Sequence, residues 1–170
     1  MTSLQSAWRL IISDYKRYSR GGKLTMFFTI LTARNHCFTY SFWLRLAATK
    51  NPIGLFARLK HYRLSRKYGI QISPFMKLGK GLYIGHGVGI IVHPYTEIGD
   101  NCNISQFLTI GSNHSTPAKI GNNVYIGPNV CIVEDVMIGD NVKIGAGTVV
   151  IKDIPSNSTS VGNPNRIIQK

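Results

Sequence analysis

Aliphatic residues return at about every sixth position through the second half of the chain. The register slips by two residues and then by four, so it falls into three blocks: Ile72, Leu78, Ile84 and Ile90; Ile98, Ile104 and Ile110; Ile120, Ile126, Ile132, Ile138, Ile144 and Val150. Six residues suit neither a 3.6-residue helix nor a plain alternating strand. The pattern therefore predicts short strands joined by bends, whose stacked coils form a solenoid.

A second pattern gives the number of faces in each coil. Glycine often follows the aliphatic residue, where it relaxes the backbone at a bend. It is replaced at Ser73 and Ile91, which are 18 residues apart, and at Val133 and Ile151, which are also 18 apart. Three hexads then make one coil. A small or medium apolar residue lies four positions after most register residues and is expected to point inward, as at Val88, Cys102, Val124, Val130, Val136 and Val142.

The first part of the chain has a helical period instead. Breaks at Gly21-Gly22, near Asn35 and at Asn51-Pro52 separate four helical segments, since proline suits a first helical turn. Gly69 suits the end of the last one. Apolar residues of the first segment recur at three- or four-residue spacing, at Leu4, Trp8, Ile11 and Tyr15. We predict an α-helical region at 1–69, a parallel β-helix at 70–154 and a C-terminal tail at 155–170.

The positive charge is concentrated in the helical region. Residues 1–68 hold 13 of the 20 lysines and arginines and one acid, Asp14, whereas the rest of the chain holds seven bases and six acids. Three interpretations stay open. The helices present solvated faces and pack their apolar sides, they contact an anionic membrane surface, or they bind nucleic acid, for which no recognition motif is present.

Several other classes of protein are not favoured. No apolar run reaches the roughly 18 to 20 residues that a spanning helix needs, and there is no signal-peptide pattern. Cys37, Cys102 and Cys131 lack metal-ligand spacing, so we expect reduced, packed thiols. These features predict a cytoplasmic protein, with peripheral contact at the inner membrane face as the alternative location.

Two segments carry a resemblance to a known family: "IGNNVYIGPNVCIVEDVMIGDNVKIGAGTVVIKDIP" and the closing "VGNPNRII". They resemble the hexapeptide-repeat acyltransferases, and within them the serine acetyltransferases and their relatives in surface-polysaccharide gene clusters. The resemblance covers residues 70–170 closely. It implies a left-handed β-helix, assembly as a homotrimer or a dimer of trimers, and acetyl-CoA lying between neighbouring β-helices.

His86 interrupts the repeat, and its setting "YIGHGVGIIV" matches the motif around that family's catalytic histidine. Transfer of acetyl from a thioester to a hydroxyl needs a base, and a neutral imidazole near pH 7 is suited to that task. The imidazolium can then return the proton to the departing thiolate, so no covalent intermediate is required. The resemblance also implies that the turn at Gly111 and Ser112 faces the thioester, where backbone N–H groups would stabilise an oxyanion.

The resemblance further implies a set of contacts with the coenzyme. Pro128 and Asn129 correspond to the turn whose backbone meets the pantetheine. Lys143, Ala146, Lys152 and Arg166 correspond to further contacts, and cations there suit the phosphates. No metal is expected.

The chain departs from the serine acetyltransferases where they hold the amino acid. Gln71 replaces the aspartate that orients the histidine, and Gly85 replaces the acid before it. The arginine and histidine of the next loop fall at about Thr116 and Pro117. These losses predict a sugar hydroxyl as acceptor, in a surface polysaccharide or its lipid-linked precursor, held by Gln71, Asn113 and His114. A backbone carbonyl or Gln71 would orient His86.

Three other functions stay open. The first is serine O-acetylation for cysteine biosynthesis. The second is a zinc hydratase of the β-helix type, with His86, His93 and His114 as ligands. The third is a structural solenoid that binds no CoA.

Overall fold

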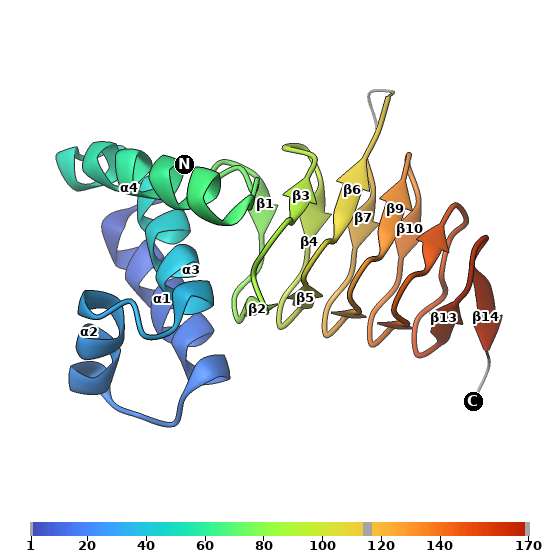
Figure 1. Cartoon of the computed structure of the whole chain (residues 1–170), viewed down its shortest axis with the longest axis horizontal. Coiled ribbons are helices and arrows are strands. Elements are labelled where there is room, and N and C mark those ends of the chain that lie inside the picture. The colour runs from blue at the N-terminus through green and yellow to red at the C-terminus, as the bar shows by residue number, and fades with distance from the viewer. Residues whose placement is uncertain (1, 114–116, 169–170) are drawn as a thin grey trace.

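The computed structural model describes residues 2–113 and 117–168, and it consists of a helical region followed by a β-helix (Figure 1). The helices are α1 (Leu4–Tyr18), α2 (Lys23–Leu31), α3 (His36–Ala47) and α4 (Pro52–Tyr68). The strands are β1 (Lys77–Leu78), β2 (Tyr83–Gly85), β3 (Ile91–Val92), β4 (Glu97–Ile98), β5 (Asn103–Ser105), β6 (Thr109–Gly111), β7 (Lys119–Ile120), β8 (Tyr125–Ile126), β9 (Cys131–Val133), β10 (Met137–Ile138), β11 (Lys143–Ile144), β12 (Val149–Val150), β13 (Thr159–Val161) and β14 (Arg166–Ile168).

The helix boundaries follow from capping residues. The side chains of Ser3, Asn35 and Asn51 accept a hydrogen bond from a backbone N–H in the first turns of α1, α3 and α4. Pro52 begins α4, and Gly69 ends it in the left-handed region at φ 65°. The helices predicted from these breaks are confirmed. No helix in the described part of the chain is both long and apolar enough to cross a bilayer.

The strands form three sheets, one for each face of the coil. Sheet I has the order β1-β4-β7-β10, sheet II the order β2-β5-β8-β11-β13-β14, and sheet III the order β3-β6-β9-β12. All pairs are parallel except β13 with β14, which is antiparallel. Each coil thus contributes one strand to each face, and the predicted β-helix is confirmed. Strands β13 and β14 lie within 155–170 and extend sheet II.

One aliphatic column on each face fills the core. Nearly all of these side chains are buried, because each coil is covered by its neighbours. The columns are Leu78, Ile98, Ile120, Ile138 and Ile154 in sheet I, Ile84, Ile104, Ile126 and Ile144 in sheet II, and Ile72, Val92, Ile110, Ile132 and Val150 in sheet III.

The first insertion lies elsewhere than the repeat predicted. Val92, and not Ile90, pairs with Ile110, while Ile84 pairs with Ile104. The two extra residues therefore lie between Ile84 and Val92. The assignment of this register position to Ile90 was wrong, and Val92 holds it. The two residues are hard to tell apart in the sequence because both are buried aliphatic residues, two positions apart and on the same side of the chain. Val88, expected to point inward, is 43% exposed because it lies in this longer corner.

A buried ion pair joins the helical region to the first coil. Arg45 Nε lies 2.9 Å from Asp14 Oδ2, with both side chains almost fully buried. Arg45 also donates to the carbonyl oxygens of Leu78 (2.9 Å) and Gly79 (2.6 Å), and Asp14 accepts from the N–H of Leu82 (2.9 Å). Helices α1 and α3 are thereby fixed to the coil that precedes His86.

Candidate active site

His86 lies at the corner between sheets II and III, directly after β2, and its side chain is exposed. Its φ of 50° is in the left-handed region, which few non-glycine residues adopt. This corner carries the two-residue insertion, so the imidazole stands on a wider bend than its counterparts in later coils. The histidine that interrupts the sequence repeat therefore also lies at an irregular corner of the β-helix.

Three elements hold this corner in place. The N–H of Gly87 donates to Cys37 Sγ of α3 (3.1 Å), and the N–H of Gly89 donates to the carbonyl of Tyr68 at the end of α4 (3.0 Å). The hydroxyl of Tyr18 in α1 accepts from the N–H of Ile84 at 2.6 Å. A β-carbon at Gly87 would lie 3.0 to 3.2 Å from three buried side chains, so only glycine fits there without a shift. The helices therefore position the histidine.

The groups that hold the corner stay uncharged. Burial raises the pKa of the Cys37 thiol, and it raises the pKa of the Tyr18 phenol well above its usual range. A raised pKa keeps both groups protonated at neutral pH. Neither therefore supplies a thiolate nucleophile or a phenolate base beside His86.

Gln71 contacts the corner through its backbone. Its N–H donates to the carbonyl of Ile90 (2.7 Å), and its carbonyl accepts from the N–H of Val92 (2.9 Å). Among the described residues, no hydrogen bond or ion pair reaches the ring of His86. Orientation of His86 by Gln71 therefore stays a prediction.

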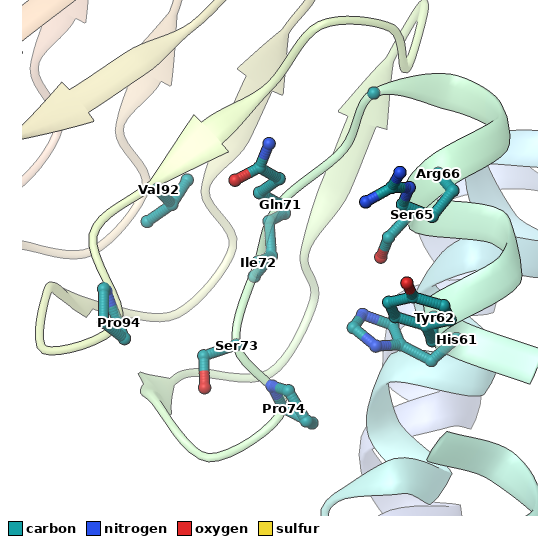
Figure 2. A pocket seen from close by; sticks show the side chains of 11 residues that line it. His61, Tyr62, Ser65, Arg66, Gln71, Ile72, Ser73, Pro74, Val92 and Pro94 are labelled. Atoms are coloured by element: carbon teal, nitrogen blue, oxygen red, sulfur yellow. The ribbon is translucent and has the colours of Figure 1, made fainter. Parts of the chain in front are cut away.

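The side chain of Gln71 lines a cleft of about 600 Å³ between α4 and the first coils (Figure 2). Burial lowers the pKa of His61 in this cleft to about 4, so His61 is neutral at pH 7. Its Nε2 lies 2.9 Å from the hydroxyl of Tyr40. The lining comprises His61, Tyr62, Ser65, Arg66, Gly69, Gln71, Ile72, Ser73, Pro74, Val92 and Pro94.

Some of the residues expected to bind the coenzyme share an edge with His86. Pro128, Asn129 and Ala146 lie at the same corner between sheets II and III, in later coils. Backbone hydrogen bonds connect this edge from coil to coil: Phe107 N–H to Val88 (3.0 Å), Asn129 N–H to Gln106 (3.0 Å) and Gly147 N–H to Pro128 (2.9 Å).

The other expected residues lie apart from His86. Gly111 and Ser112 are at the opposite edge of sheet III, and Lys152 is just beyond the end of β12 in the same sheet. Crossing that sheet from Phe107 to Ser112 takes five extended residues, or roughly 16 Å. Lys143 and Arg166 are exposed on sheet II. One chain therefore does not bring Gly111 and Ser112 to His86.

Sequence reasoning missed a carboxylate at this opposite edge. Ser112 Oγ donates to Glu134 Oε2 (3.1 Å), and the N–H of Asn113 lies 3.4 Å from Oε1. Glu134 adopts φ 60°, so a glutamate occupies a turn position that favours glycine or asparagine. A glutamate at a turn position that favours glycine or asparagine was the sequence feature that could have identified this carboxylate. Asn113 is exposed, and His114 lies outside the described residues.

The described residues hold no group of three histidine, cysteine or acidic side chains that could bind a metal ion. His93 is one of the three histidines considered above as zinc ligands. The centre of its ring lies 5.7 Å from the centre of the Tyr95 ring.

Comparison with known proteins points to one family. The model "Bacterial transferase hexapeptide (six repeats)" matches residues 117–152. The chain is 35% identical over 142 residues to "Serine acetyltransferase 1, chloroplastic" of Arabidopsis thaliana, covering 81% of this chain and 43% of that one. It superposes on the soybean serine acetyltransferase apoenzyme with a TM-score of 0.80 and 28% identity, covering 96% of this chain and 69% of that one. A serine acetyltransferase solved in complex with CoA matches with a TM-score of 0.74 and 25% identity, covering 97% and 71% of the two chains.

These matches overturn the predicted sugar acceptor, because the relatives and structural neighbours are serine acetyltransferases. The error came from treating charges lost at Gln71, Gly85 and Thr116 as a lost amino-acid site. Another element can supply a charge that a motif lacks, and Arg66 of α4 lines the cleft beside Gln71. The chain spans less than half the length of the Arabidopsis relative.

Proposed function

This chain belongs to the hexapeptide-repeat family of left-handed β-helix acyltransferases, and from that premise we propose that it transfers acetyl from acetyl-CoA to the hydroxyl of L-serine. The observation that carries the proposal is the likeness to serine acetyltransferases over 96% of the chain, helices included. The chain keeps an exposed histidine on the β-helix corner that these helices hold.

The proposed reaction needs one base. The neutral imidazole of His86 takes the proton of the serine hydroxyl, and the oxygen attacks the thioester carbonyl carbon. As the tetrahedral intermediate collapses, the C–S bond breaks and the imidazolium returns the proton to the CoA thiolate. The products are O-acetyl-L-serine and CoA. Cys37 is not required as a nucleophile, in agreement with its raised pKa.

We also propose that the coenzyme lies between two copies of the chain. The residues assigned to it occupy two edges of sheet III that are too far apart to meet within one chain, with Pro128, Asn129 and Ala146 on one edge and Gly111, Ser112 and Lys152 on the other. A cyclic trimer places unlike edges of neighbouring copies together. Lys143 and Arg166 would then contribute cations for the CoA phosphates.

The direct test of acetyl transfer is release of CoA thiol from acetyl-CoA when L-serine is added to the purified chain. We expect serine-dependent release above the rate without an acceptor. Release with sugars but not with L-serine would contradict the proposal.

We propose, as a second point, that the helical region rests on an anionic membrane surface. Its one acid, Asp14, is buried against Arg45, so every exposed charged side chain described in residues 2–68 is positive. A second copy would bring like charge to this face and repel it, whereas anionic lipid would not. Large apolar side chains are exposed beside these cations, on α2 at Leu24, Phe27, Phe28 and Leu31 and on α4 at Ile53, Leu55, Phe56, Leu59 and Tyr62.

Vesicle binding should therefore depend on charge and on α2. We expect co-sedimentation with phosphatidylglycerol-containing vesicles but not with pure phosphatidylcholine, and loss of binding as salt rises, because the Debye length is about 10 Å at 0.1 M. Replacing Phe27 and Phe28 with serine should weaken binding. Met137→Ser, at a 60% exposed site on the β-helix, is the control. Equal binding to both vesicles, or binding to neither, would exclude this surface.

A further inference from the structure

We infer that Arg66 binds the carboxylate of the acceptor amino acid, in the cleft between α4 and the first coils. The inference rests on the proposed function and names a residue that neither the repeat nor the motif around His86 indicated. In this arrangement Arg66 is the cation that Thr116 and Pro117 do not supply.

The first observation is the charge of the cleft. Arg66 is exposed in the last turn of α4, and Figure 2 shows its guanidinium reaching into the space in front of Gln71. Its Cζ lies 5.9 Å from the centre of the Tyr62 ring, and no carboxylate among the described residues pairs with it. His61 is neutral, and no acid lines the cleft. The cleft therefore holds one unpaired cation and favours an anion.

The second observation is the geometry of the anion that the Arg66 guanidinium can bind. A guanidinium donates two parallel hydrogen bonds to a carboxylate, which a lysine cannot do. The amide of Gln71 and the hydroxyls of Ser65 and Ser73 line the same space and offer further hydrogen bonds. A volume of about 600 Å³ lies within the usual range of small-molecule sites. The ligand class that fits is a small polar carboxylate.

The third observation connects the cleft with His86. The corner that carries His86 donates from Gly89 to the carbonyl of Tyr68, and its last residue, Ile90, accepts from the N–H of Gln71. Gly69 and Gln71 also line the cleft. Residues 68–71 thus lie between the cleft and the corner that carries His86, and they contact both. The cleft that holds Arg66 therefore adjoins the backbone of the histidine corner.

The test compares L-serine with L-serinamide, which has the hydroxyl and the ammonium but no carboxylate. In Arg66→Gln we expect kcat/KM for L-serine to fall by about 10- to 100-fold, mainly through KM, since a hydrogen bond to a charged group is lost. The kcat/KM for L-serinamide and the KM for acetyl-CoA should not change. Arg66→Lys should recover only part of the loss. Arg63→Gln is the matched control, because Arg63 is exposed on the same helix outside the cleft.

Two results would overturn the inference. One is an equal loss for both acceptors in Arg66→Gln, and the other is no loss for L-serine. If the unaltered chain acetylates neither acceptor, the proposed function fails, and the role of Arg66 is then decided by binding alone. Chemical shifts of the chain on titration with L-serine should in that case respond in the unaltered chain and not in Arg66→Gln. A response in both would exclude Arg66 as the carboxylate ligand.

Discussion

Replacing His86 with asparagine is expected to lower kcat for acetyl transfer to L-serine by about 10² to 10⁴-fold, the usual contribution of a positioned proton acceptor. The KM for acetyl-CoA should stay near its original value, because the imidazole acts on the acceptor hydroxyl. Asparagine is chosen since the residue has φ 50°, a conformation that asparagine tolerates better than alanine. His86→Ala should lose as much activity but also some stability at this corner.

Two controls separate chemistry from assembly. The asparagine variant should unfold at the same urea concentration as the unaltered chain. Both should sediment at the mass of a trimer, because the coenzyme site is shared between copies. Near-normal turnover in His86→Asn would remove this residue as the base. A fully active monomer would contradict the shared site.

Replacing Asp14 with alanine is expected to lower the free energy of unfolding by about 3 to 5 kcal/mol, because it leaves the buried Arg45 without its counter-ion. The carboxylate accepts from Arg45, from Ser41 Oγ (2.7 Å) and from the N–H of Leu82 (2.9 Å), and all three donors lose this partner. Urea unfolding followed by circular dichroism gives the difference. The helices should also loosen from the first coil, so activity should fall.

The matched comparison is the double variant Asp14→Ala with Arg45→Met. It removes the stranded charge and should be more stable than Asp14→Ala alone. Lys77→Ala breaks the exposed pair with Glu97 (2.7 Å) and should leave the urea midpoint close to that of the unaltered chain, because exposed ion pairs contribute little to stability. An effect of Asp14→Ala as small as that of Lys77→Ala would show that the buried pair does not hold the two regions together.

The sequence was sufficient for the β-helix and for the helix boundaries. Both depend on local rules: a six-residue period in which each coil needs only its neighbours, and caps such as Asn35, Asn51 and Gly69 that act within one helical turn. The location of the first insertion could not be found in the same way. Ile90 and Val92 are both aliphatic and both buried, so only the pairing of Val92 with Ile110 distinguishes them.

The candidate site was only partly predictable because its supports are distant in sequence. His86 could be singled out by its motif, but Cys37, Tyr18 and Tyr68, which hold its corner, belong to helices with no motif. Arg66 lies in the last turn of α4, which leads into the first coil (Figure 1), but no motif marks it in the sequence. Counting charges within the motif alone therefore led to the wrong acceptor.

The most direct measurement is the identity and yield of the acetylated product. The purified chain is incubated with acetyl-CoA and L-serine without added metal, and free CoA and O-acetyl-L-serine are both quantified by mass spectrometry. We expect one O-acetyl-L-serine for each CoA released, and neither product from His86→Asn above background. Release of CoA without acetylated serine, or no release when L-serine is present, would contradict serine O-acetylation by this chain.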